Sequence, residues 1–223
     1  MTSPTQAIRP AHAGDAAAIT HILATGFRED PPLAWILTDR ADRERLSPVF
    51  FQPFVDMVLT DGHGYIAEDL SGAALWLDVD VHAETTEDSG ELREPTTERG
   101  TSEAEVQPDE FRQRFIDGLG SEYAKRFFIL DELFSGSHPG HESHAYLLFI
   151  GVVPDRQCQG VGTALLNAGL GPVDQAIRPA YVEASTKRNA ALYARHGFES
   201  MGEPIALPDG PSLYPMWRPP AGS

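Results

Sequence analysis

The sequence predicts one α/β domain, spanning residues 1–223 and built on a mixed β-sheet, and two stretches support that class. Two short apolar runs, 65–67 and 73–77, are joined by a turn, which is typical of an antiparallel hairpin. Later, the apolar run 146–153 leads through a glycine-rich turn into a helical segment and then into a short strand over 180–185. Such a strand–helix–strand unit indicates an α/β arrangement. The length suffices for one domain with a proper core, and no linker sets off a second.

The N-terminal elements follow from capping and periodicity. Residues 5–10 alternate like an edge strand, and Asp15 is a good N-cap for a helix whose apolar residues recur three and four positions apart. That helix is expected to end near Gly26. The pair Pro31-Pro32 follows it, and we expect this pair to break the chain.

A second helix is expected over residues 46–58, where the apolar side chains form one face. Pro48 and Pro53 lie inside it. Because proline cannot donate the helical hydrogen bond, a kink or an interruption is predicted there. Two further helices and the final strand are expected over residues 111–117, 122–133 and 213–218.

Residues 78–108 lose hydrophobic periodicity and are rich in Glu, Thr, Ser and Gly. Such a stretch cannot bury enough apolar surface to offset the entropy of ordering it, so we interpret it as a mobile acidic insertion that could act as an active-site flap. The formal net charge of −16 argues against a nucleic-acid partner and is compatible with a cationic amine substrate. Half of that charge lies in residues 81–110, which contain ten acidic residues and two arginines. The net charge therefore need not reflect the active site.

Composition also bears on compartment and partners. No apolar run approaches the roughly 18 residues that a membrane span requires, and residues 1–9 lack the basic-then-apolar pattern of a signal peptide. A single cysteine, Cys158, excludes an internal disulfide and fits a reducing compartment. We therefore expect a cytoplasmic protein with no membrane partner, either monomeric or homodimeric.

A glycine-rich turn is the most informative motif. Gln157, Gly160 and Gly162 form a Q-x-x-G-x-G pattern between the apolar run and the helical segment. Glycines let the main chain approach a phosphate, while the unpaired N–H groups and positive dipole end of the helix face it. The turn lacks the Lys-Ser/Thr ending of a nucleotide triphosphate loop and the three glycines of a dinucleotide fingerprint. A phosphate site of another kind is predicted.

A second constellation follows the strand 180–185, namely Asn189, Tyr193 and the pair Gly197-Phe198. Together the two segments resemble the GNAT superfamily of acyl-CoA-dependent N-acyltransferases. Shorter runs that resemble the puromycin N-acetyltransferase branch lie at residues 73–76, 152–155, 182–185, 188–189, 193–198 and 207–211. The likeness is strongest over 144–218, weaker over 5–77 and weakest between 78 and 143.

The resemblance implies a mixed, mostly antiparallel twisted sheet flanked by helices, whose splayed central strands hold acyl-CoA. It implies acetyl-CoA as the acyl donor, with its pyrophosphate on the glycine-rich turn and its pantetheine arm along the preceding strand. The expected cofactor-binding residues are Ile150, Gly151, Val152, Val153, Gln157, Cys158, Gln159, Gly160, Val161, Gly162, Thr163, Ala164 and Asn189. Cys158 departs from the family, which usually has Gly there, and it would carry strain if its φ is positive.

Tyr193 matches the family tyrosine that protonates the departing thiolate, since a phenol with a pKa near 10 keeps its proton at neutral pH. Packing of a short helix is the structural alternative. Asn189 would cap that helix or bond the pantetheine arm. Glu183, an acid on an apolar strand, is a candidate base; binding of the substrate ammonium or a structural hydrogen bond are its alternatives. Candidate acceptor-pocket residues are Phe27, Glu29, Asp30, Tyr65 and Trp76, with core packing the alternative for each aromatic.

Two other patterns are weaker. His138, His141 and His144 recur every third residue, but Pro139-Gly140 prevents a helix and no further ligand completes a set, so no metal site is predicted. A nucleophilic Cys158 would lie at the pyrophosphate, away from the thioester, which favours direct transfer.

The resulting hypothesis is an acetyl-CoA-dependent N-acetyltransferase acting on a primary amine of a small molecule, such as an antibiotic or a biosynthetic intermediate. Three alternatives stay open. The donor could be a carrier-protein thioester or a longer acyl-CoA; the acceptor could be a protein N-terminus; or the chain could be a CoA-binding regulatory module without turnover.

Overall fold

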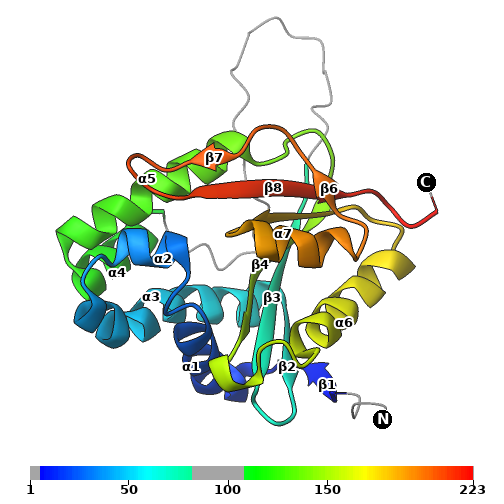
Figure 1. The fold of residues 1–223 in the computed structure, drawn as a ribbon, viewed down its shortest axis with the longest axis horizontal. Coiled ribbons are helices and arrows are strands. Elements are labelled where there is room, and N and C mark those ends of the chain that lie inside the picture. The colour runs from blue at the N-terminus through cyan, green and yellow to red at the C-terminus, as the bar shows by residue number, and fades with distance from the viewer. Residues whose placement is uncertain (1–5, 82–107, 223) are drawn as a thin grey trace, which may run out of the picture.

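The computed structural model describes residues 6–81 and 108–222, with the side chains of residues 108 and 109 excluded (Figure 1). The predicted acidic insertion falls almost entirely on residues 82–107, which lie outside the described residues. The strands are β1 (Ile8–Pro10), β2 (His63–Ala67), β3 (Gly72–Val79), β4 (His144–Val152), β5 (Ala180–Ala184), β6 (Glu199–Ser200), β7 (Ile205–Ala206) and β8 (Ser212–Arg218). The helices are α1 (Ala16–Gly26), α2 (Pro31–Ile36), α3 (Arg40–Asp61), α4 (Pro108–Leu119), α5 (Ser121–Ser137), α6 (Val161–Gln175) and α7 (Lys187–Ala194).

The strands form a sheet in the order β1-β2-β3-β4-β5-β8-β6, and β7 pairs with β8. The pair β4–β5 is parallel, while the other strand pairs of the described chain are antiparallel. The prediction of a mixed, mostly antiparallel sheet is therefore confirmed. One apolar core lies between the sheet and α1, α3, α4 and α5, and a second lies between the sheet and α6 (Figure 1). No helix among residues 6–81 and 108–222 is long and apolar enough to cross a membrane.

The proline-containing segments differ from expectation. Pro31 and Pro32 begin α2 instead of breaking the chain. The N–H groups in the first turn of a helix have no partner within the helix, so a proline there loses no helical hydrogen bond. The helix α3 runs for 22 residues without interruption, although Pro48 and Pro53 lie inside it. Its packing supplies the compensation, since Phe50 and the residues around it lie in the larger core.

Asp15 precedes α1 as predicted, but its carboxylate does not cap that helix. It accepts two hydrogen bonds from the Arg9 guanidinium, at 2.7 and 2.8 Å, and one from the His12 main-chain N–H at 3.0 Å. Hydrogen bonding to Arg9 holds the pKa of Asp15 well below its usual range. The acid therefore ties β1 to the start of α1.

The parallel strands β4 and β5 are paired over a short stretch, and beyond it the two strands are no longer joined by hydrogen bonds. Only Ala145–Ala180 and Tyr146–Tyr181 are paired. Just beyond, the register between β3 and β4 shifts between Leu75 and Trp76, so that β4 holds one extra residue, Leu148. A bulge bends its strand and increases the local twist, which carries the rest of β4 away from β5. The expected splay of the central strands follows from this bulge.

Candidate active site

The glycine-rich turn forms the expected junction of β4 and α6. Gly160 is the N-cap of α6 and has a φ of 88°, a left-handed conformation that favours glycine. The first main-chain bond of the helix runs from the Ala164 N–H to the Gly160 carbonyl at 2.9 Å. The N–H groups of residues 161–163 therefore have no partner within the helix. They point out of a 15-residue helix at its positive dipole end, which is the arrangement that binds phosphate.

The two glutamines of the turn maintain its shape. The Gln157 side-chain amide donates to the Val152 carbonyl at 3.1 Å, and the Gln159 amide donates to the Asp155 carbonyl at 2.8 Å. Both side chains thus cross-brace the turn, which leaves its main-chain groups to meet a ligand.

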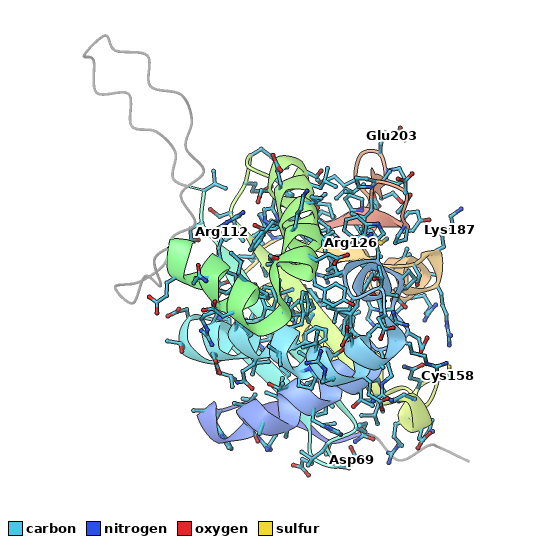
Figure 2. The ribbon with its side chains drawn as sticks, turned by 90° about the vertical axis from the view of Figure 1, so that its left-hand side faces the viewer. Asp69, Arg112, Arg126, Cys158, Lys187 and Glu203 are labelled. Carbon is cyan, nitrogen blue, oxygen red and sulfur yellow. The ribbon has the colours of Figure 1, made fainter. Side chains whose placement is uncertain are left out.

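Cys158 has a φ of 60°, so the strain expected for a non-glycine residue at this position is present. The thiol is exposed, and Nη2 of Arg188 lies 2.7 Å from its Sγ atom. Arg188 stands at the start of α7, and Figure 2 shows its neighbour Lys187 on the same edge of the molecule as Cys158. The structure therefore adds a guanidinium to the phosphate turn. The only feature of the sequence that could have pointed to this guanidinium is that Arg188 is a cation shortly after β5, directly before Asn189.

Replacing Arg188 with Ala is expected to raise the Kd for acetyl-CoA about tenfold, since a charge-assisted hydrogen bond contributes roughly 1.5–3 kcal/mol. Arg195→Ala is the matched control, because Arg195 is exposed near the other end of α7 and bonds only its own helix, at the Ala191 carbonyl. Calorimetric titration checks both variants. Equal Kd values for Arg188→Ala and the parent would remove Arg188 from the phosphate site.

The predicted pantetheine strip of β4 lies on the opened side of the sheet. Beyond Tyr146, β4 has no pairing with β5, so an extended ligand can add to it as a strand would. Phe27 lies beneath this strip and packs against Gly151, where a Cβ atom would meet the Phe27 ring at 3.3 Å. Gly26 is equally close, since a Cβ there would lie 3.0 Å from the Val152 carbonyl oxygen. Close packing of α1 thus supports the strip from below.

Tyr193 lies on α7 and is buried, with its ring centroid 5.9 Å from that of Phe198. Burial raises the pKa of its phenol, and the charges of Asp30 and Glu183 raise it further. Among the described residues, no side chain makes a hydrogen bond with the Tyr193 hydroxyl. The phenol therefore keeps its proton at neutral pH and is free to donate it.

Asp30 belongs to a chain of three side chains that sequence reasoning did not assemble. The Asn189 amide donates to the Ser185 hydroxyl at 3.0 Å, and that hydroxyl donates to the Asp30 carboxylate at 2.6 Å. Burial raises the pKa of Asp30 to about 6, and the Ser185 hydrogen bond opposes this rise. Asn189 is not the N-cap of α7, because Thr186 takes that role by accepting from the Asn189 main-chain N–H at 3.1 Å.

Glu183 lies on the same strand as Tyr181, with only 3 % of its side chain exposed. Its Oε1 atom is buried and has no hydrogen-bond partner among the described residues. The nearest basic group is His138, whose Nδ1 atom lies 3.9 Å away. A buried carboxylate with an unfilled acceptor site is suited to a cationic ligand or to proton transfer.

Three predicted acceptor-pocket residues lie elsewhere. Glu29 is largely exposed and pairs with Arg40 at 3.7 Å. Trp76 is buried on the α6 face of the sheet, where its indole fills the space beside Gly169. Tyr65 packs against the same core from β2, which β3 separates from β4. Both aromatics thus pack in the core beside α6. Alternation along a strand does not tell which face of the sheet carries the site.

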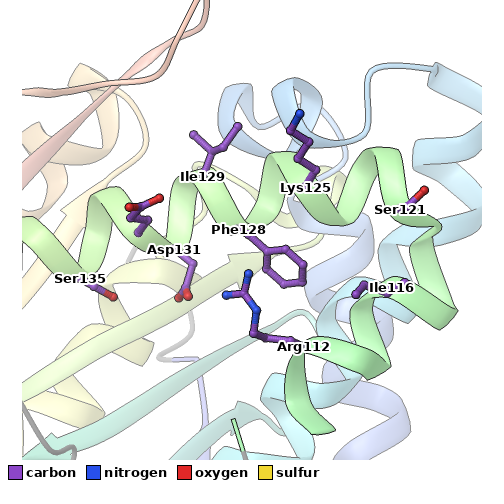
Figure 3. Close-up of a pocket in the computed structure, with 9 residues that line it drawn as sticks. Arg112, Ile116, Ser121, Lys125, Phe128, Ile129, Asp131 and Ser135 are labelled. Atoms are coloured by element: carbon purple, nitrogen blue, oxygen red, sulfur yellow. The ribbon is translucent and has the colours of Figure 1, made fainter. Parts of the chain in front are cut away.

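A groove of about 610 Å³ lies between α4 and α5 (Figure 3). The Arg112 guanidinium stacks over the Phe128 ring there, 3.9 Å from its centroid. None of the candidate catalytic residues lines this groove. It therefore does not contribute to the site at the opening of β4 and β5.

The chain is similar to known acetyltransferases in sequence and in fold. Residues 125–200, from α5 to β6, match the family model described as an acetyltransferase (GNAT) domain. The chain is similar to a solved Corynebacterium glutamicum protein described as histone acetyltransferase HPA2 and related acetyltransferase, with 26 % identity, 98 % of each chain covered and a TM-score of 0.68.

Two further structures share the fold at lower identity. An agmatine N-acetyltransferase has 13 % identity and a TM-score of 0.58, and arylalkylamine N-acetyltransferase 2 from Aedes aegypti has 13 % identity and a TM-score of 0.55. In both cases 96 % of this chain and 98 % of the other are covered. Residues 125–200 match a GNAT acetyltransferase domain, and the protein is an acyltransferase of the N-acetyltransferase class, with acetyl-CoA as its acyl donor.

Proposed function

We propose that the protein transfers an acetyl group from acetyl-CoA to the primary amine of a small cationic molecule, directly and without an acetylated enzyme. One observation carries the proposal. The phenol of Tyr193 lies near the partly buried carboxylate of Asp30 and the buried carboxylate of Glu183, and its pKa is raised by burial and then by these two charges. The three come from α7, the start of α2 and β5, at the opening that follows the β4–β5 pairs.

Each side chain has a role that fits its environment. Acetyl-CoA supplies the acetyl group as a thioester. The Asp30 carboxylate holds the ammonium group of the acceptor by its charge, and Glu183 removes a proton from that nitrogen so that its lone pair can attack. Tyr193 gives its proton to the departing sulfur. The buried setting strengthens each of these interactions.

An acceptor screen tests the function. The purified protein is incubated with acetyl-CoA and either agmatine or tyramine, with glutamate as the anionic comparator, and both free CoA thiol and N-acetylated product are measured. We expect product from the cationic amines and almost none from glutamate, because the carboxylates of Asp30 and Glu183 repel an anion. Thiol release with no N-acetylated product from either cationic amine would contradict the proposal.

Asp30 makes acceptor binding depend on pH. Its raised pKa of about 6 means that the counter-charge is lost as pH falls below that value, so the KM for a cationic amine rises from pH 7 to pH 5. Asp30→Asn should show a high KM that no longer changes over this range. Initial rates at varied amine concentration measure both, and an unchanged parent KM between pH 7 and pH 5 would exclude the role.

The Asp30→Asn variant, which should weaken amine binding, should make the folded protein more stable at high pH. Because the pKa of Asp30 is raised on folding from 3.8 to about 6, its contribution to stability is present below pH 4 and is lost as pH rises through 6. Asp30→Asn removes a buried charge at pH 8 while its amide oxygen can still accept from Ser185. We expect a higher Tm than the parent at pH 8 and no gain at pH 4. A lower Tm at pH 8 would contradict this account.

We also propose the finer assignment to the puromycin N-acetyltransferase branch, with an antibiotic or a biosynthetic intermediate as acceptor. The runs 152–155, 182–185 and 193–198 support it. Acetylation of puromycin in the same assay, at a rate comparable with that of the best amine, is the expected result.

A further inference from the structure

The buried base needs a route by which its proton leaves. Glu183 has 3 % of its side chain exposed, whereas His138, which faces it, has 20 % exposed. His138 follows α5 directly. In the sequence it is one of three histidines that recur every third residue. His138 is the more exposed of the two side chains, Glu183 and His138.

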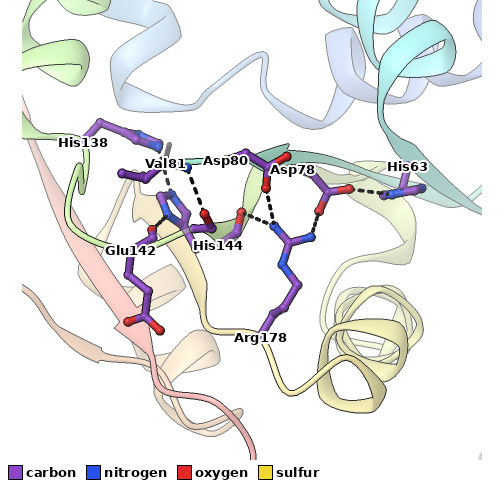
Figure 4. A network of polar contacts seen from close by, with 9 residues as sticks. His63, Asp78, Asp80, Val81, His138, Glu142, His144 and Arg178 are labelled. Carbon is purple, nitrogen blue, oxygen red and sulfur yellow. Dashed lines mark hydrogen bonds and ion pairs between the residues drawn. The ribbon is translucent and has the colours of Figure 1, made fainter. Parts of the chain in front are cut away.

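The histidine beside it, His144, fixes the protonation pattern of His138 (Figure 4). His144 is fully buried, and its Nδ1 atom lies 2.8 Å from the Glu142 main-chain carbonyl. A carbonyl only accepts, so His144 Nδ1 carries a hydrogen. Burial lowers the pKa of His144 to about 4, so the ring is neutral and its Nε2 atom is an acceptor.

The Nε2 atoms of His138 and His144 are 3.0 Å apart. Because His144 Nε2 must accept, His138 Nε2 must donate and therefore carries a hydrogen. This leaves Nδ1 as the one position of the His138 ring where a proton can be gained or lost. That atom is the one that faces Glu183, at 3.9 Å.

The groups around His138 favour a proton on its Nδ1 atom. The titratable groups that face its ring are Glu183 and Tyr181 on β5 and His144 and Tyr146 on β4. Burial and the charge of Glu183 raise the pKa of Tyr181, so its hydroxyl stays neutral. Arg178, which lies beyond His144, is paired with Asp78 and Asp80, while His141 stacks on Trp217. Glu183 is thus the anion that faces Nδ1.

We propose that His138 is the proton outlet of the acetyl transfer, taking on Nδ1 the proton that Glu183 removes from the acceptor ammonium and releasing it to solvent. The inference rests on the proposed function. An ammonium nitrogen loses two protons as the N–C bond forms and the C–S bond breaks. One passes through Glu183 and His138 to water. The other returns to the Tyr193 oxygen, which has given its own proton to the sulfur of CoA.

Chemical rescue tests the relay. His138→Ala is expected to lower kcat roughly 100-fold, the lower end of typical acid–base contributions, with the KM for acetyl-CoA unchanged, and added imidazole should restore part of kcat. The assay uses acetyl-CoA with the better of agmatine and tyramine. His141→Ala, a nearby exposed histidine, should show neither loss nor rescue. In a His138→Ala/Glu183→Gln double variant, imidazole should have no effect.

Two further measurements distinguish a proton relay from a positioning role of His138. His138→Gln keeps an N–H for His144 but cannot carry a proton, so it should be as slow as His138→Ala; parent-like kcat would show that His138 only positions its neighbours. Nitrogen-15 shifts of the histidine rings at pH 8 should show hydrogen on Nε2 of His138 and on Nδ1 of His144. The opposite tautomer of His138 would overturn the relay, independently of turnover. A parent protein that acetylates neither amine would overturn the proposed function itself.

Discussion

Replacing Tyr193 with Phe is expected to lower kcat roughly 100-fold while leaving the Kd for acetyl-CoA unchanged, because a positioned general acid contributes about 10²–10⁴ to rate. The ring remains, so its packing against Phe198 and the surrounding core is kept. Only the proton donor is removed. Pre-steady-state and steady-state rates with thiol detection give kcat, and calorimetry gives Kd.

Tyr65→Phe is the matched control for this experiment, because it removes a phenol hydroxyl from β2, on the α6 face of the sheet. It should leave kcat unchanged. A Tyr193→Phe variant as fast as the Tyr65→Phe variant would assign Tyr193 to packing alone.

Replacing Gly160 with Leu should abolish most of the affinity for acetyl-CoA, raising its Kd at least tenfold, or about 1.4 kcal/mol. Gly160 has a φ of 88°, which a leucine adopts only under strain. A Cβ atom there would meet no other atom within 4 Å, so the fold itself need not rearrange. The side chain instead occupies the space above the N–H groups where a phosphate would bind.

Gly202→Leu separates this effect from backbone strain. Gly202 also has a positive φ, 68°, and open space around its Cα, but it lies in the turn between β6 and β7. Both variants should lose similar stability in thermal unfolding, while only Gly160→Leu loses affinity. Equal Kd values for the two variants would show that the turn is not the phosphate site.

Sequence patterns predicted the helices, strands and turns whose conformation depends on residues close in sequence. The apolar run of β4 and the helix α6 follow from the sequence pattern, and a glycine at position 160 permits the left-handed conformation found there. The positive φ of Cys158 was also predictable as a possible strain, from the motif position that it occupies. These features depend on neighbours only a few residues away.

The arrangement of the side chains at the candidate site depends on partners distant in sequence, and that part was not predictable. Asp30 and Ser185 are 155 residues apart, and no local rule pairs them. The chain also holds the bulge residue Leu148, which opens the sheet without any signal in the apolar run that contains it. The Asp15 carboxylate does not cap α1 for a different reason, since Arg9, six residues away, offers it a stronger, charged partner.

The most direct test of the central claim is a calorimetric titration of the protein with acetyl-CoA and with acetylpantetheine, which lacks the phosphates. In the proposed site the pyrophosphate lies on the N–H groups of the first turn of α6 and beside Arg188. We therefore expect micromolar binding of acetyl-CoA and at least about tenfold weaker binding of acetylpantetheine. Equal affinities, or no binding of acetyl-CoA, would contradict it.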